Sequence, residues 1–408
     1  MNRKEIRQFL NEMDFIRTGG SDEELRAAEL LKARCEALGV KSWLEPFPVE
    51  MAEIASATLT VDGVPVKCEG FKNCGSGAVE AELLYLPNTD AASLAAAKGK
   101  IVLIETGVTH FLFQDLVKAG IAGFITYTGD VHYADADVDK RELRSYVRMD
   151  SKRLGVNINA KDALKIVQKG ARTARIEIDQ REWMGESRDV VAEKPGKRDE
   201  WIVLTAHYDS TPLSRGSYDN MSGCLGLLCV LEALKNEELN YGLRLIFCGS
   251  EERGLLGSKA WTAAHEGELD KVALNINLDM IGSTMGKFIA CVSAEDALVS
   301  YIRYMGAEKG WGVAARSGVY SSDSTPFADH GVPAVSFARI AQHNQATIHN
   351  RYDTPALLSD AQLQKDSAFI AAFTRRMATA AVCPVKREIP ESVRKELDHY
   401  LNRKRRDA

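Results

Sequence analysis

WIVLTAHYD (residues 201–209), LRLIFCGSEE (243–252) and VALNINLDM (272–280) are three apolar runs, and each ends in side chains that can bind a metal ion. Between Trp201 and Gly282 such runs alternate with loops and apolar helical segments, so we predict the order strand, loop, helix, strand, loop, helix, strand. In an open α/β sheet the ligand crevice lies outside the carboxyl ends of the strands. The polar ends of the three runs are therefore predicted to meet in one site.

Asp219 lies between the first two runs, in GSYDNMSG (216–223), directly before an apolar helix. One interpretation is a helix N-cap, for which an Asp is well suited. The flanking glycines, Gly216 and Gly223, favour a second interpretation, in which the backbone comes close to a bound group.

The first run ends in His207 and Asp209, which point to the same side of a strand. A His that binds a metal usually needs a carboxylate or carbonyl partner that fixes its tautomer, and Asp209 is suited to that task. An ordinary surface pair is the alternative.

Glu251 and Glu252 are adjacent carboxylates, which repel each other unless a cation or a proton separates their roles. One can bind a metal while the other contacts a water, and a solvated turn is the alternative. Asp279 follows the buried pattern NINL and needs a partner, because an unpaired buried charge is costly. His349, in ATIHNRYDTP, is either a further ligand or a surface His.

These candidates offer nitrogen and oxygen ligands without thiolates, which suits zinc, manganese or cobalt better than a structural zinc site with cysteines. One carboxylate that bridges two ions ~3.5–4 Å apart would hold an attacking water and a tetrahedral intermediate between them. The Glu that does not bind metal would then accept the proton of the water.

The motifs HYDS, GSYDNMSG, SEERGLLGS and NLDMIG, followed by His349, resemble the co-catalytic zinc aminopeptidases. That family also contains aminopeptidase Y, the glutamate carboxypeptidases and glutaminyl cyclase. The resemblance implies an α/β fold with a mixed, mostly parallel, doubly wound sheet and helices on both faces. Within the chain, GKIVLI and the later LVKAGIAGFITY resemble a protease-associated (PA) domain, which implies a β-rich insert.

The resemblance also implies two zinc ions, with manganese or cobalt as possible replacements. His207 and Asp279 hold one ion, and Glu252 and His349 hold the other. Asp219 bridges both, and the peptide bond that follows it is expected to be cis.

Three further residues receive roles from the same resemblance. Asp209 orients His207. Glu251 is the general base and then the acid that donates a proton to the leaving amine. Tyr320, in the segment before SSDSTPFADHG, is expected to polarise the substrate carbonyl.

The 408 residues are enough for more than one domain. We predict a zinc peptidase domain at residues 1–51 and 187–385, an inserted PA-like domain at 52–186, and a charged C-terminal tail at 386–408. Ser21 and Glu24 form a capping-box pattern that predicts the start of an N-terminal helix. Asp62-Gly63 predicts a hairpin turn within the insert.

A net charge of −5 argues against a basic nucleic-acid surface. No apolar run approaches the ~18 residues of a membrane span, and no signal peptide is visible, so a cytoplasmic protein without membrane partners is expected. The sequence does not indicate an oligomeric state.

The predicted function is a metallo-aminopeptidase that hydrolyses N-terminal residues from peptides. The alternatives are a single-zinc acyltransferase similar to glutaminyl cyclase, a carboxypeptidase of the same family, and a non-catalytic scaffold with the same domains. The metal content per chain and the blocked terminus that a substrate tolerates would separate these alternatives.

Overall fold

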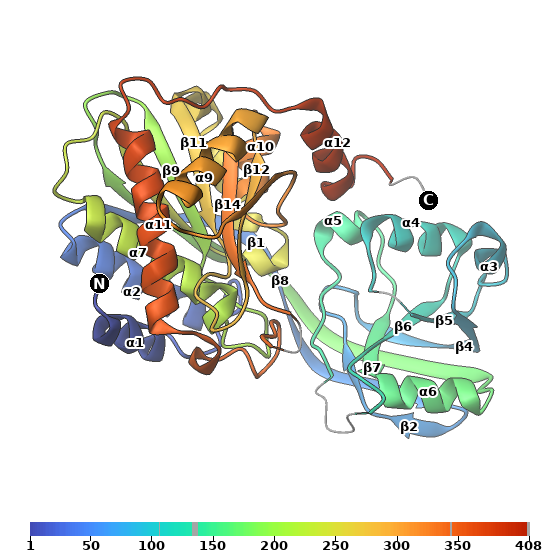
Figure 1. The fold of residues 1–408 in the computed structure, drawn as a ribbon. Coiled ribbons are helices and arrows are strands. Elements are labelled where there is room, and N and C mark those ends of the chain that lie inside the picture. Colours follow the sequence, from blue (N-terminus) through green and yellow to red (C-terminus); the bar gives the residue numbers. More distant parts are fainter. Residues whose placement is uncertain (106, 133–137, 343–344, 406–408) are drawn as a thin grey trace. The chain divides into compact units, whose positions relative to one another are not determined.

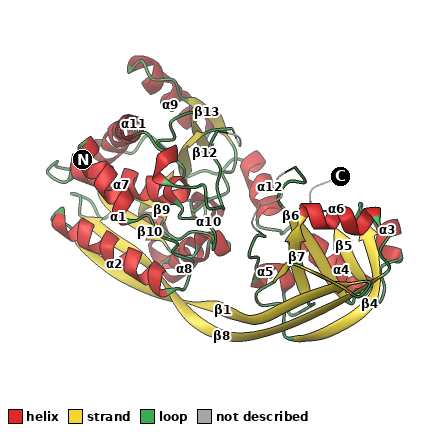
Figure 2. Cartoon of the chain, turned by 90° about the horizontal axis from the view of Figure 1, so that it is seen from below, coloured by secondary structure: helices red, strands yellow, loops and turns green. Residues whose placement is uncertain are grey.

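The structure, a computed structural model, describes residues 1–105, 107–132, 138–342 and 345–405. The chain divides into two compact units: residues Met1–Val49 with Glu186–Ala408, and residues Glu50–Gly185. Two long strands, β1 (Lys41–Val61) and β8 (Thr173–Lys194), pair with each other and carry the chain between the units (Figure 2). The boundaries predicted from the sequence fall within these two strands.

The first unit contains a sheet whose central strands were expected from their apolar sequences. Its order is β13 (Ala314–Ser317), β12 (Lys287–Ser293), β14 (Ala334–Ile340), β11 (Val272–Leu278), β9 (Trp201–His207), β10 (Gly242–Cys248) and the C-terminal part of β8. Strand β9 is parallel to both of its neighbours, β10 and β11, and β11 is parallel to β14. Strands β8 and β12 run antiparallel to β10 and β14. The predicted mixed, mostly parallel sheet is confirmed, and four carboxyl ends meet at one edge.

Both faces of this sheet are covered, as the alternation of side chains in β9 illustrates. Ile202 and Leu204 belong to a core with helices on one face, whereas Val203 packs on the opposite face with Trp261 and Phe327. The first face is covered by α1 (Arg3–Glu12), α2 (Asp22–Ala37), α7 (Ser222–Leu234), α9 (Asp296–Glu308) and α11 (Asp360–Thr379). The second face is covered by α8 (Leu256–Ala264) and α10 (Ser324–Asp329), which gives the doubly wound arrangement (Figure 1).

The segment expected to be a charged tail contains a helix, α12 (Glu391–Tyr400). Its buried side chains Val393 and Leu397 share a small apolar cluster with Ala328 of α10 and Ala334 of β14. Apolar residues at this helical spacing therefore attach the end of the chain to the first unit.

The capping box predicted at the start of α2 is only half correct. Ser21 is the N-cap, and its side chain accepts a hydrogen bond from the N–H group of Glu24. The carboxylate of Glu24 does not return to Ser21; it accepts the N–H of Gly20 and is completely buried.

The second unit has a smaller sheet of its own. From β8 the order continues through β4 (Gly77–Leu86), β5 (Ile101–Ile104), β6 (Gly123–Thr128), β7 (Gly155–Asn159) and β3 (Cys68–Gly70). Strand β2 (Val64–Val66) pairs with the end of β1 across the predicted turn, with Val61 opposite Val64. The helices of this unit are α3 (Ala91–Ala95), α4 (His110–Ala119), α5 (Ser145–Arg148) and α6 (Ala160–Gln168).

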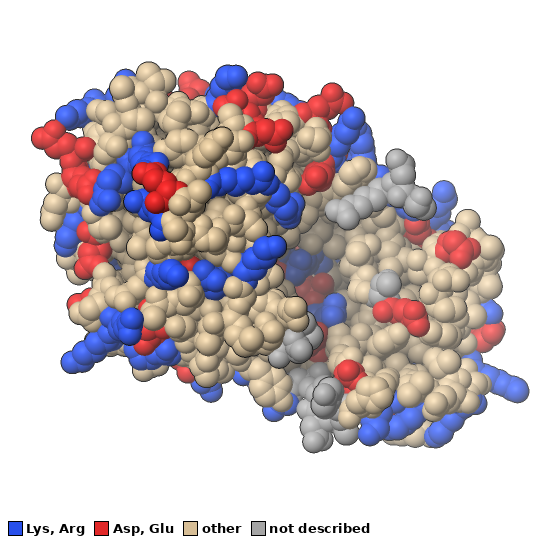
Figure 3. Space-filling view, in the orientation of Figure 1, with Lys and Arg blue, Asp and Glu red and all other residues tan. Residues whose placement is uncertain are grey.

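Charges of both signs are interspersed on each unit over the face drawn in Figure 3. All eight cysteines are free thiols. Among the described residues, no helix has both the length and the hydropathy needed to cross a membrane.

The core over β9 predicts a large effect of truncation at Leu204, which is fully buried. Leu204→Ala should lower the free energy of unfolding by about 3 kcal/mol, because it removes buried methyl groups and leaves a cavity. Val382→Ala is the control: its side chain is 73% exposed, and its truncation should cost less than about 0.5 kcal/mol. Urea denaturation of both variants measures the difference, and equal losses would contradict this packing.

Candidate metal centre

The candidate ligands lie at the carboxyl edge of the parallel strands. His207 is the last residue of β9, and Asp279 follows β11 directly. Glu251 and Glu252 lie in a short 3-10 helix after β10, and Asp219 lies in a single irregular turn before α7. The parallel register thus brings together residues at the carboxyl ends of β9, β10 and β11, as the sequence predicted for this edge.

Three buried side chains form the first group of possible ligands. The Nε2 atom of His207 lies 3.1 Å from Oδ1 of Asp219 and 3.7 Å from Oδ1 of Asp279. One ligand atom from each residue falls within 4.8 Å of the others, which is close enough for a single ion to contact all three.

The second group shares Asp219 with the first. The Nε2 atom of His349 lies 3.1 Å from Oδ2 of Asp219 and 3.1 Å from Oε2 of Glu252. The two oxygens of Asp219 therefore face different histidines, and this carboxylate stands between the two groups. The side chain of His349 is 51% exposed, so the second group is open to solvent.

The peptide bond between Asp219 and Asn220 is cis, as expected. The amide of Asn220 accepts the N–H groups of Gly223 and Met280, each at 3.0 Å, and donates to the carbonyl of Leu278 at 2.8 Å. This side chain therefore joins the loop that carries Asp219 to the segment around the end of β11.

Asp209 is completely buried and contacts two parts of the centre. Its Oδ1 lies 3.4 Å from Nδ1 of His207, a position from which it can orient the imidazole. Its oxygens also accept the backbone N–H groups of Glu251 at 2.9 Å and Glu252 at 3.2 Å. This second contact was not predicted, because sequence spacing does not show which distant N–H groups a carboxylate will reach.

Asp353 is a further buried carboxylate that the sequence analysis did not select. It accepts the N–H of Tyr218 at 2.7 Å and the N–H of Asp219 at 3.1 Å. Burial, together with the nearby charge of Asp219, raises the pKa of Asp353 to about 7 against the effect of these hydrogen bonds. In the sequence this residue could not be distinguished from a turn residue, since only its position four residues after His349 relates it to the site.

Arg17 was also missed, although its guanidinium is fully buried. It donates to the carbonyl oxygens of Tyr208, Arg215 and Gly216. The first of these residues follows the candidate ligand His207, and the other two precede Asp219. A cation with several fixed donors is well suited to holding irregular backbone whose carbonyl groups lack partners in a helix or strand.

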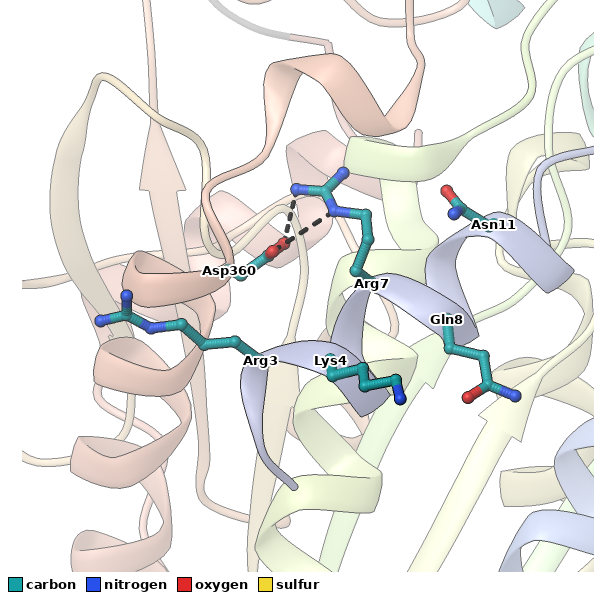
Figure 4. A pocket seen from close by; sticks show the side chains of 6 residues that line it. All are labelled: Arg3, Lys4, Arg7, Gln8, Asn11 and Asp360. Carbon is teal, nitrogen blue, oxygen red and sulfur yellow. Dashed lines mark hydrogen bonds and ion pairs between the residues drawn. The ribbon is translucent and has the colours of Figure 1, made fainter.

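Arg7 of α1 makes comparable contacts with the segment after His349. It donates to the carbonyl oxygens of Pro355 at 2.9 Å and Leu358 at 3.3 Å and forms an ion pair with Asp360. The pocket beside it has a volume of about 550 Å³ and contains none of the predicted site residues (Figure 4). Its lining consists of Arg3, Lys4, Arg7, Gln8, Asn11 and Asp360.

The electrostatics of the centre favour a bound cation. Burial raises the pKa of Glu251 well above its usual range, and the nearby carboxylates Asp323, Glu252 and Asp279 add to this effect. Within the described part of the chain, the buried Oδ1 atom of Asp279 has no hydrogen-bond partner. A concentration of oxygen ligands with negative charge fits divalent metal ions, which would offset the repulsion.

Tyr320 has a buried hydroxyl group that also lacks a hydrogen-bond partner among the described residues. Burial and the negative charges of Asp279 and Asp219 raise its pKa well above 10. The phenol therefore stays protonated and can donate a hydrogen bond to a ligand.

Comparison with known proteins identifies relatives of this chain. Residues 189–374 match peptidase family M28. The chain is 29% identical to leucine aminopeptidase 2 of Trichophyton rubrum over 279 residues, which is 65% of this chain and 55% of the relative. It is 26% identical to aminopeptidase YwaD of Bacillus subtilis over 340 residues, 79% of this chain and 71% of the relative. The chain thus spans about half the length of the fungal relatives that it matches.

Solved structures share the fold over nearly the whole chain. A zinc aminopeptidase from Bacillus subtilis, BSAP, superposes with a TM-score of 0.79 at 22% identity and covers 96% of this chain and 98% of its own. An aminopeptidase from Aneurinibacillus sp. strain AM-1 superposes with a TM-score of 0.76 at 23% identity and covers 94% and 96%. The α/β fold is therefore that of these structures.

The contacts of Gly223 predict that a methyl group there will disturb the centre. A Cβ atom would lie 2.3 Å from the carbonyl oxygen of Leu278 and 2.4 Å from Oδ1 of Asn220. Gly223→Ala should therefore cost about 2 kcal/mol of stability and weaken zinc binding, because Asn220 must move. Gly267→Ala is the matched control, since a Cβ there meets no atom within 4 Å. Thermal unfolding and competition with a chromophoric chelator measure both effects. If the two variants behave alike, the contacts of Asn220 do not support the metal centre.

Proposed function

We propose that this chain, of which residues 189–374 match peptidase family M28, is a zinc-dependent aminopeptidase that removes N-terminal residues from peptides. The observation that carries the proposal is the pair of ligand groups that share Asp219 beside Glu251. The names of the relatives, leucine aminopeptidase 2 and aminopeptidase YwaD, support the reaction and the peptide substrate.

Two zinc ions are proposed, one for each ligand group. His207 and Asp279 would hold the first, Glu252 and His349 the second, and Asp219 would bind both through its two oxygens. Zinc supplies a Lewis acid that polarises the scissile carbonyl and lowers the pKa of the attacking water. The nitrogen and oxygen donor set supports this choice of metal, and the zinc aminopeptidase with the same fold agrees with it.

Glu251 is proposed to move the protons of the reaction. Its Oε2 atom lies 3.9 Å from Nε2 of His207, so the carboxylate reaches the first ligand group. It accepts a proton from the attacking water and then donates this proton to the amine that leaves as the peptide bond breaks. Asp209, which holds the backbone N–H of Glu251, fixes the starting point of this side chain.

Tyr320 is proposed to donate a hydrogen bond from its hydroxyl group to the substrate carbonyl oxygen as negative charge develops there. A buried donor without a partner among the described residues is preorganised for this purpose. We also propose that residues 52–186 form a PA-like domain, which their resemblance to that domain type supports. The cytoplasmic location stays a prediction.

Replacing the general base tests the proposal directly. Glu251→Gln keeps the size of the side chain but cannot accept the proton, so kcat for an aminoacyl amide should fall by about 10²–10⁴-fold with zinc still bound. Steady-state kinetics and metal analysis of the same sample measure the two effects. The control is Glu266→Gln at an exposed position.

Substrates that differ in their blocked end separate the proposed reaction from its alternatives. N-acetylated peptides should resist hydrolysis, whereas peptides with an amidated C-terminus should be cleaved. Cleavage confined to peptides with a free C-terminus, or wild-type turnover by Glu251→Gln, would overturn the proposal.

The number of metal ions is tested at His349, whose Nε2 atom belongs only to the second ligand group. His349→Ala should reduce the zinc content from about two ions per chain to about one after dialysis, because an imidazole ligand is lost. Metal analysis by mass spectrometry measures the content. His132→Ala, at an exposed position in the second unit, should retain both ions. A single zinc in the wild-type chain would refute the two-ion proposal.

A further inference from the structure

Glu24 is a buried acid whose contacts reach the catalytic loop from outside the residues matched to the peptidase family. Its Oε2 accepts the N–H of Gly20 at 2.7 Å. Its Oε1 accepts the hydroxyl of Ser187 at 2.8 Å and the N–H of Ser250 at 2.9 Å. One carboxylate thus connects helix α2, strand β8 and the loop that follows β10.

Ser250 directly precedes Glu251 and has a left-handed backbone, with φ +52° and ψ +34°. Residues other than Gly, Asn and Asp seldom adopt this conformation, so surrounding groups must hold it. Glu24 binds the N–H of Ser250, and Asp209 binds the next two N–H groups along the chain. Three successive N–H groups are therefore held by carboxylates from two distant segments.

The space around this contact is filled on both sides. A Cβ atom at Gly19 would lie 2.3 Å from Oγ of Ser250, and one at Gly249 would lie 3.0 Å from Oε1 of Glu24. The two segments approach so closely only because both positions lack a side chain.

A role in helix capping alone does not account for these contacts. The N-cap of α2 is Ser21, whose side chain accepts the N–H of Glu24. Burial, with a contribution from Asp209, raises the pKa of Glu24 to about 7. A residue that only fills space would not carry this cost of an acid in the interior.

We propose that Glu24 is a positioning residue that holds Ser250 in its left-handed conformation and thereby directs Glu251 and Glu252 into the metal centre. The N-terminal segment is then part of the catalytic apparatus, although it contributes no ligand. This inference rests on the proposed peptidase function.

Glu24→Gln tests the inference, because the amide keeps one acceptor oxygen and replaces the other by a donor, so the side chain can no longer accept the N–H groups of Gly20 and Ser250 together. We expect kcat to fall about ten- to hundredfold with little change in KM, since the base is misplaced while substrate contacts remain. Zinc affinity, measured by chelator competition, should also fall, because the proposed ligand Glu252 is displaced together with the base. Glu23→Gln, at the exposed neighbouring position, should retain both values.

Rescue distinguishes positioning from a general loss of stability. Adding Ser250→Gly to Glu24→Gln should recover a large part of kcat, because glycine adopts a positive φ without steric cost. Gly19→Ala displaces Ser250 from the other side, and Ser250→Gly should rescue this variant too by removing the Oγ atom that it meets. The second pair provides the test if Glu24→Gln does not fold.

Wild-type kcat and zinc affinity in Glu24→Gln would overturn the inference. So would a loss of kcat that follows the folded fraction and is not rescued in either pair. If the wild-type chain hydrolyses no peptide, the proposed function fails on its own, and zinc affinity in the same variants still decides whether Glu24 positions the loop.

Discussion

The main constraint on this structure is that several carboxylates lie together at one edge of a parallel sheet, where they repel one another. Asp219, Glu251, Glu252 and Asp279 converge there with two histidines, although no apolar environment favours such a concentration of negative charge. Divalent cations bound between these carboxylates would offset this cost. The same constraint accounts for the position of Asp219 between the two groups of possible ligands, since one carboxylate there serves both groups with fewer acids.

Irregular backbone provides the precision of the site, and side chains rather than neighbouring strands hold that backbone. Loops at a sheet edge leave N–H groups without partners, and buried acceptors satisfy them here. Asp209, Asp353 and Glu24 each accept backbone N–H groups of, or directly beside, a proposed ligand or the proposed base. Arg17 performs the converse task for carbonyl groups. Since each anchor comes from a different element, the site becomes rigid only when the whole unit has folded.

The role of the sheet is to position the side chains of the site. Parallel register between β9, β10 and β11 places the carboxyl ends of three strands at one edge, and packing on both faces of the sheet fixes these strands. Catalytic side chains on such a support need little reorganisation when a substrate binds, which is the usual basis of electrostatic preorganisation. Helix α1 extends this support, because Arg7 holds the segment that follows His349.

The resemblance to a known family implied the doubly wound class, whereas the sequence pattern by itself determined the succession of strands and helices from Trp201 to Gly282 and the candidate side chains at the strand ends. It could do so because apolar runs and the residues that end them are local patterns. Only the tertiary structure decided which backbone groups the buried acids would hold. Glu24 shows the limit: its spacing from Ser21 predicts a capping box, whereas its carboxylate reaches Ser250, 226 positions along the chain. Hydrogen bonds over such separations depend on how layers pack, and no local pattern in the sequence encodes that packing.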